Sequence, residues 1–188
     1  MERRKNLLIG IVVGLVIVVA SVHATGLSER LLILFGTSDE YESSESTMAP
    51  ALAHGDWINS ESLRLEDLRG RVVLVEFWTF GCINCRNTLP FVKSWHDRYR
   101  EQGMTVIGVH SPEFAEERVV ENLHRQVDSL GINYPVVSDN DFETWRAYDV
   151  QAWPTLFLLD KQGRIRWKHV GEGDYDETER VIQKLIAE

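Results

Sequence analysis

The two cysteines of this 188-residue chain stand together in a single C-x-x-C, as Cys82 and Cys85. They follow the apolar run 72–78, which is typical of a buried strand, and they begin a polar, periodic segment that is typical of a helix. The first thiol would then lie at the positive end of a helix, where backbone N–H groups favour the thiolate. The second lies three residues later on the same face, close enough to form a disulfide with the first. This arrangement suits reversible thiol–disulfide exchange.

Two other uses of the cysteine pair are less consistent with the sequence. A structural disulfide would close a ring of only four residues, which removes little chain entropy and so stabilises a fold weakly. A zinc site usually needs four ligands, and none of the six histidines stands at ligand spacing from another or from the cysteines. No metal and no other cofactor is therefore expected. In the redox interpretation, Cys82 attacks a substrate disulfide and Cys85 resolves the mixed disulfide.

The N-terminus has the pattern of a membrane-targeting segment. Residues 1–5 are mostly basic, and residues 7–22 are almost continuously apolar. We expect residues 1–27 to form a hydrophobic helix, either an uncleaved signal anchor or a signal peptide cleaved after Ala24. The apolar residues 31–35 favour the anchor, since they could lie at the membrane interface. In both cases the rest of the chain is expected on the exported side of the membrane, in the cell envelope.

Composition divides the remainder into a linker and one folded domain. Residues 28–50 form the juxtamembrane segment, and its part 37–50 is acidic and Ser-rich, as in a disordered tether. Residues 51–188 are enough to bury one ordinary core. The formal net charge of -9 argues against a nucleic-acid partner.

Periodicity within the domain predicts alternating strands and helices. Strands are expected at 72–78, 104–110, 134–137, 156–159 and 165–170, and helices at 82–101, 114–130, 142–148 and 174–186. A small hairpin is expected within 57–65. The turn at Gly163 would make the last two strands antiparallel neighbours, so the sheet would be mixed, with helices on both faces.

Glu76 interrupts the apolar strand that precedes the cysteines. It either faces solvent near the end of the sheet or is buried, and burial would raise its pKa. A buried carboxylate below the cysteines could accept the proton of Cys85 as that thiol becomes a nucleophile. Trp78 and Phe80 are expected to shape the rim of the site.

Several motifs resemble one family. The run 77–85 (FWTFGCINC) and the turn 153–155 (WPT) resemble thioredoxin-like proteins of the TlpA/ResA type. The stretches 109–114 (VHSPEF) and 171–175 (GEGDY) are similar to the thioredoxin-like domain that the DipZ group fuses to a CcdA-type membrane protein. The similarity extends from about residue 68 to the end.

The resemblance implies a three-layer thioredoxin-like sandwich, with 114–148 as an inserted helix–strand unit. It also implies that Pro154 follows a cis peptide bond and faces the cysteines, with Trp153 and Thr155 docking the substrate beside it. The proton-relay role of Glu76 is carried over from thioredoxin, because many TlpA-type domains have an uncharged residue there.

The resemblance also implies a function. The protein would reduce disulfides in exported proteins, with apocytochrome c as a candidate client, and a CcdA/DsbD-type membrane protein would supply its electrons. The direction of electron flow depends on the reduction potential, so a dithiol oxidase is the nearest alternative. A thiol peroxidase would have Thr79 as here but a proline in place of Val75. A metallochaperone of this fold would space its cysteines by three residues and add a histidine.

Overall fold

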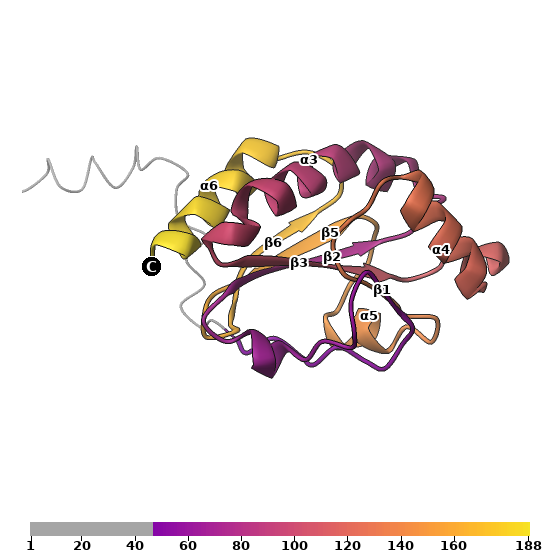
Figure 1. Cartoon of the computed structure of the whole chain (residues 1–188), viewed down its shortest axis with the longest axis horizontal. Helices are drawn as coiled ribbons and strands as arrows, with labels where there is room; N and C mark the ends of the chain where they lie inside the picture. Colours follow the sequence, from indigo (N-terminus) through magenta and orange to yellow (C-terminus); the bar gives the residue numbers. More distant parts are fainter. Residues whose placement is uncertain (1–46) are drawn as a thin grey trace, which may run out of the picture. The chain divides into compact units, whose positions relative to one another are not determined.

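The computed structural model describes residues 47–188 (Figure 1). The expected signal segment 1–27 and most of the expected tether 28–50 lie outside the described residues. Within residues 47–188, no helix is long and apolar enough to cross a membrane.

A six-stranded mixed sheet forms the centre of the domain, in the order β1-β4-β3-β2-β5-β6. The strands are β1 (Trp57–Ile58), β2 (Val72–Trp78), β3 (Met104–His110), β4 (Val136–Ser138), β5 (Thr155–Leu159) and β6 (Ile165–Val170). β2, β3 and β4 are parallel, whereas β5 runs antiparallel to β2, β6 to β5, and β1 to β4. The mixed sheet predicted from the turn at Gly163 is confirmed.

Helices cover both faces of this sheet. They are η1 (Leu65–Leu68), α3 (Ile83–Tyr99), η2 (Arg100–Gln102), η3 (Ala115–Arg118), α4 (Val120–Ser129), α5 (Glu143–Ala147) and α6 (Tyr175–Ala187). In Figure 1, α3 and α6 lie on one side of the sheet and α5 lies on the other. The three-layer α/β sandwich expected from the sequence is therefore present.

β2 contributes to an apolar core on each side of the sheet. Leu74 and Trp78 belong to the cluster that includes residues of α3, α4 and α6, whereas Val73, Val75 and Phe77 belong to the cluster on the opposite face. Successive strand side chains point to opposite faces, so a strand covered on both sides must be apolar at nearly every position. This explains the continuous apolar run before the cysteines.

Two local predictions were wrong. Residues 57–65 do not form a hairpin, because the short strand β1 pairs with β4 across the chain, with Trp57 opposite Val137. The helix predicted over 114–130 is divided into η3 and α4, with Val119 extended between them. The Glu117 carboxylate accepts hydrogen bonds from the backbone just before η3 and so fixes the start of that helix, whereas the break itself lies at the extended Val119, the N-cap residue of α4.

The described chain begins with residues that are bonded to the start of β6. The N–H of Ile165 donates to the carbonyl of Thr47 at 2.9 Å, and the N–H of Ala49 donates to the carbonyl of Gly163 at 3.0 Å. Met48 forms an isolated antiparallel bridge with Arg164. Residues 47–50 of the expected tether are thus packed along the sheet.

Candidate active site

The carboxyl ends of β2 and β3 and the start of β5 meet at one edge of the sheet. Trp78 is paired with His110, and Phe77 is paired with Thr155. The turn that follows β2 and the Trp153–Pro154 turn that precedes β5 therefore leave the sheet at the same edge. This register brings together the cysteine and proline motifs, which lie far apart in the sequence.

Cys82 and Cys85 differ in accessibility. Cys82 is the N-cap residue of α3, and its Sγ accepts a hydrogen bond from the N–H of Cys85 at 3.3 Å. Cys82 is partly exposed and Cys85 is buried, and both are free thiols. Burial raises the pKa of the Cys85 thiol, and its hydrogen bond with Cys82 raises it further. A substrate can therefore reach Cys82, and Cys85 is held protonated behind it.

Glu76 is fully buried on β2, so the solvent-facing alternative is excluded. The hydroxyl of Tyr134 donates to its Oε2 at 2.9 Å, and its Oε1 has no hydrogen-bond partner. Burial raises the pKa of Glu76 to about 7, although the Tyr134 hydrogen bond acts in the opposite direction. The carboxylate also contributes to the raised pKa of Cys85, after burial and the bond with Cys82. Glu76 and Cys85 are therefore electrostatic neighbours.

His110 is a buried residue of the site that the sequence reasoning missed. Its Nε2 lies 3.2 Å from Oγ1 of Thr79, and its ring stacks on Phe80 at a centroid distance of 5.3 Å. Burial lowers the pKa of His110 to about 4, so the ring is neutral at pH 7. Its position was the available signal, because polar residues at the carboxyl ends of parallel strands collect at binding sites.

Two residues expected to contact substrate are buried instead. Trp78 has no exposed surface, because its position on β2 directs it into the α3 side of the core, where its ring packs edge-on against His110. Thr155 is also fully buried, and its hydroxyl donates to the carbonyl of Ala152 at 2.7 Å. Phe80 is only partly buried and packs against the same core.

The peptide bond between Trp153 and Pro154 is cis, as the resemblance implied. Trp153 is partly buried, and its ring lies 4.5 Å from that of Trp145. Pro154 is buried, and its carbonyl accepts a hydrogen bond from the N–H of Gly171 at 2.8 Å. Trp153 therefore offers the accessible surface of this turn.

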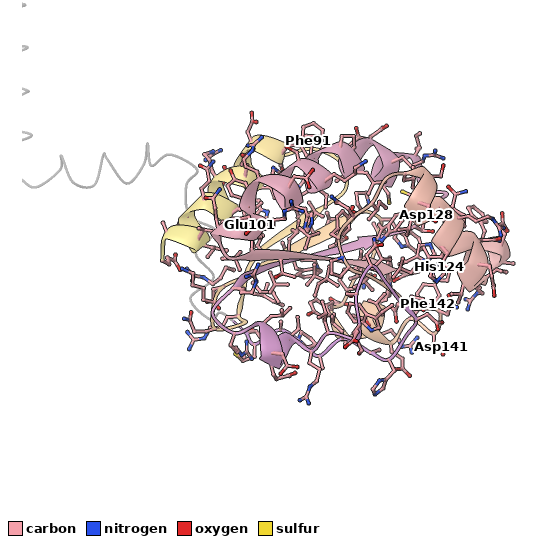
Figure 2. The ribbon with its side chains drawn as sticks, in the orientation of Figure 1. Phe91, Glu101, His124, Asp128, Asp141 and Phe142 are labelled. Carbon is pink, nitrogen blue, oxygen red and sulfur yellow. The ribbon has the colours of Figure 1, made fainter. Side chains whose placement is uncertain are left out.

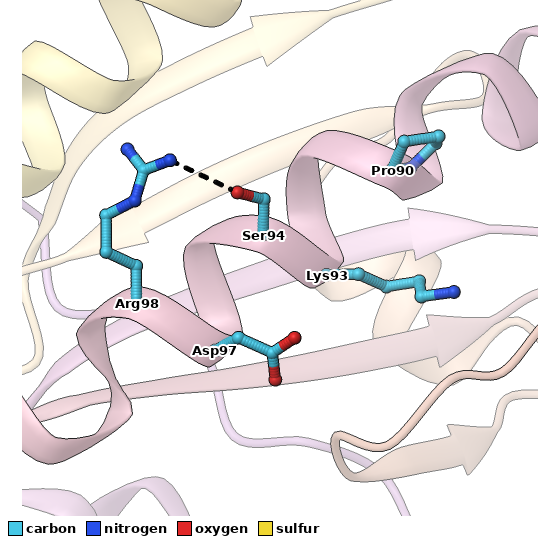
Figure 3. Close-up of a pocket in the computed structure, with 5 residues that line it drawn as sticks. All are labelled: Pro90, Lys93, Ser94, Asp97 and Arg98. Carbon is cyan, nitrogen blue, oxygen red and sulfur yellow. Dashed lines mark hydrogen bonds between the residues drawn. The ribbon is translucent and has the colours of Figure 1, made fainter.

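A separate hollow lies along α3 (Figure 3). It is lined by Pro90, Lys93, Ser94, Asp97 and Arg98. Its polar groups are bonded within the protein: Lys93 donates to the carbonyl of Leu130 at 2.7 Å, and Arg98 donates to Ser94 at 3.3 Å. Asn133 donates to Asp97 at 3.1 Å, so each charged side chain of the hollow has a partner within the protein. Within residues 47–188, no group of three or more His, Cys, Asp or Glu side chains is arranged to hold a metal ion.

Fold and site together define a class of protein. A C-x-x-C that caps a helix after the central strand, beside a cis-proline turn, is the arrangement of a thioredoxin-like thiol–disulfide oxidoreductase.

Comparison with known proteins agrees with this class. The model of the AhpC/TSA family matches residues 47–168. The chain is 41% identical over 133 residues to Protein DipZ of Mycobacterium tuberculosis, covering 69% of this chain and 19% of DipZ. It is 30% identical over 128 residues to the thiol-disulfide oxidoreductase ResA of Bacillus cereus, covering 68% of this chain and 71% of ResA. A crystal structure of a thiol-disulfide isomerase from Corynebacterium glutamicum superposes with a TM-score of 0.68 at 33% identity, covering 74% of this chain and 97% of that one.

The chain therefore belongs to the AhpC/TSA family, with a thioredoxin-like domain that is similar to DipZ and to the thiol-disulfide oxidoreductase ResA. It spans about a fifth of the length of the DipZ proteins that it matches.

Proposed function

We propose that this protein reduces disulfides in exported proteins through its Cys82/Cys85 dithiol. The observation that carries the proposal is the unequal pair: Cys82 is accessible and accepts a helix N–H, whereas Cys85 is buried beside Glu76. An attacking thiol needs access to substrate, and a resolving thiol needs protection from it.

In the first step, the Cys82 thiolate attacks one sulfur of a substrate disulfide. A bond forms between Cys82 and that sulfur, the substrate disulfide breaks, and the second substrate sulfur leaves as a thiolate that takes a proton from water. The N–H of Cys85 stabilises the attacking thiolate, since charge-assisted hydrogen bonds are stronger than neutral ones.

In the second step, Cys85 loses its proton and attacks Sγ of Cys82. The mixed disulfide breaks, the substrate leaves with two thiols, and the protein keeps the Cys82–Cys85 disulfide, so two electrons pass to the substrate. Glu76 is the proposed proton acceptor, because its Oε1 has no partner and its pKa of about 7 suits a base at neutral pH. Tyr134 holds the other oxygen.

Substrate docking is proposed at the turn before β5. Trp153 and Phe80 are both partly buried aromatic residues that pack against the core at the cysteine edge of the sheet, together with Cys82. Pro154 shapes the turn beside them. Trp78 and Thr155 would act from beneath, by supporting these residues rather than by touching substrate.

The setting of the reaction is also a proposal. The basic and apolar pattern of residues 1–27 supports a single membrane anchor that holds the domain on the exported side of the cytoplasmic membrane. A CcdA/DsbD-type membrane protein would recharge the disulfide, and apocytochrome c is a candidate client. The mass of the mature protein tests the anchor, because cleavage after Ala24 would leave a shorter chain.

Reduction of insulin disulfides, with dithiothreitol as electron source, tests the dithiol chemistry. We expect the wild type to accelerate the reaction, Cys82→Ser to be inactive, and Cys85→Ser to accumulate a mixed disulfide through Cys82. An inactive wild type would overturn the proposal.

Equilibration with glutathione tests the direction of electron flow. We expect a reduction potential well below that of the strongest dithiol oxidants, which is about -120 mV. A value near that figure would assign the protein as an oxidase. Rapid consumption of peroxide by the reduced protein would instead assign it as a peroxidase.

A further inference from the structure

Glu117 belongs to η3, in the inserted segment that follows β3. Its side chain contacts the turn 79–82 that leads into α3, here called the cysteine turn. Only 1% of its surface is exposed. Its Oε1 accepts a hydrogen bond from the N–H of Gly81 at 2.8 Å, and its Oε2 accepts from the N–H groups of Glu113 at 2.6 Å and Phe114 at 2.9 Å. One carboxylate thus binds three backbone donors that come from two separate parts of the chain.

The environment of Glu117 favours its charged form. Burial alone would raise the pKa of this carboxyl, but the hydrogen bonds it accepts, first that of Phe114, hold the pKa below its ordinary value. Hydrogen bonds to an ionised acceptor are roughly twice as strong as neutral ones. Glu117 therefore joins the two segments with strong, directed bonds.

Gly81 leaves no space between the cysteine turn and this carboxylate. A Cβ atom at Gly81 would lie 2.4 Å from Oε1 of Glu117, well inside van der Waals contact. The same Cβ would lie 3.7 Å from the Phe114 ring. An alanine at Gly81 would therefore force the Glu117 carboxylate to shift away from the turn.

The contact lies directly beside the reacting sulfur. Gly81 immediately precedes Cys82, whose N–H donates to the carbonyl of Thr79 at 3.3 Å and whose Sγ caps α3. A bond that fixes Gly81 therefore fixes the direction from which the chain enters α3. On the other side of the carboxylate, Phe114 is 51% exposed next to the same turn.

We propose that Glu117 is a positioning residue for thiol–disulfide exchange. Its carboxylate clamps the turn before Cys82 onto the inserted segment, so that Cys82 is held ready for attack and Phe114 forms a wall for the incoming disulfide. The inference rests on the proposed dithiol function, and it explains why a buried charge is placed at this contact.

Four single variants of the full chain test the clamp. Glu117→Ala removes it, Glu117→Gln keeps one acceptor oxygen, and Gly81→Ala pushes the carboxylate away from the turn. Glu116→Gln is the matched control, because Glu116 is an exposed carboxylate on the same η3 helix. Each protein is assayed well below its own melting temperature, for insulin reduction and for alkylation of Cys82 by iodoacetamide.

The clamp predicts a loss of rate in proteins that remain folded. We expect kcat for insulin reduction to fall roughly tenfold in Glu117→Ala, because the variant loses the one hydrogen bond to a charged group that holds Gly81 beside Cys82. Glu117→Gln should be intermediate, and Glu116→Gln should match the wild type. Unchanged kinetics in a folded Glu117 variant would overturn the inference.

A double-mutant cycle separates the clamp from general destabilisation. Gly81→Ala and Glu117→Ala disrupt one contact, so their combined effect on kcat should be clearly smaller than the product of the single effects. Independent effects would overturn the clamp. If the wild type failed to reduce insulin, the proposed function would fail, whereas the cycle could still be read from Cys82 alkylation.

Discussion

At the scale of single residues, Glu76 and His110 are two buried titratable groups with opposite shifts. Burial raises the pKa of Glu76 to about 7 and lowers the pKa of His110 to about 4. Both side chains are therefore mostly uncharged around pH 6. Each makes the stability of the fold depend on pH, in opposite directions.

Glu76→Gln should remove one of these dependences. Because the folded pKa of Glu76, about 7, exceeds the ordinary value of 4.5, its contribution to stability is full below pH 4.5 and is lost as the pH rises through 7. The wild type should lose roughly 2 kcal/mol between pH 5 and pH 8 from this group, and the variant should not. Urea unfolding at the two pH values measures the difference.

The comparison of variant with wild type at each pH isolates Glu76. His110 has a folded pKa below its ordinary value of 6.5, so its contribution is present above pH 6.5 and is lost as the pH falls through 4. That contribution is common to both proteins. An identical pH dependence in the two proteins would show that Glu76 does not titrate in this range.

The unequal burial of the cysteines predicts selective alkylation. Limiting iodoacetamide should modify Cys82 well before Cys85, because Cys82 is accessible and caps α3 whereas the buried Cys85 has a raised pKa. Peptide mass spectrometry of the reduced protein would locate the adduct. First modification at Cys85 would reverse the assigned roles of the two thiols.

At the scale of elements, β3 passes close to its neighbours where it lies opposite Glu76. A Cβ at Gly108 would lie 2.9 Å from Nε1 of Trp78 and 3.2 Å from the Tyr134 ring. Gly108→Ala should therefore destabilise the fold by about 1–3 kcal/mol through overpacking. Chemical denaturation measures this cost, and a neutral substitution would mean that the Trp78 ring has room to move.

The inserted segment should influence substrate affinity through Phe114. Phe114→Ala should change stability by only about 0.5 kcal/mol, because the ring is half exposed. It should raise KM for insulin and leave the reaction with a small disulfide reagent unchanged. A rise in KM for both substrates would mean that the substitution changes the reactivity of the thiols rather than the docking of a protein substrate.

Phe91 provides a matched control for Phe114. It is a 40% exposed aromatic residue of α3 that stacks on Tyr175, and Figure 2 shows it on α3 near α6. Nine residues along the helix place it about 13 Å from Cys82. Phe91→Ala should leave KM unchanged.

At the scale of the whole molecule, one sheet separates two apolar clusters. Ile182 of α6 is buried on one side and Phe157 of β5 on the other. Ile182→Ala should cost about 2–5 kcal/mol and Phe157→Ala about 3–5 kcal/mol. Both should lower the midpoint of one transition, coincident by circular dichroism and tryptophan fluorescence. Separate transitions would mean that the two layers unfold independently.

Prediction from sequence succeeded where local pattern decides structure. The strands expected at 72–78 and 104–110 have those bounds, because strands buried on both faces are continuously apolar. It failed at 57–65 and at 114–130. β1 pairs with a strand that is distant in sequence, and Val119 has an extended backbone that ends η3 before α4 begins.

The sequence by itself determined the cysteine pair at a strand–helix junction and the mixed sheet around it, since both depend on neighbouring residues and on turn chemistry. The tertiary structure decided which side chains meet there. The burial of Glu76 against Tyr134, the pairing of His110 with Thr79 and the burial of Trp78 all follow from strand register and layer packing. Register joins residues that are remote in the chain, so periodicity within one segment carries no information about it.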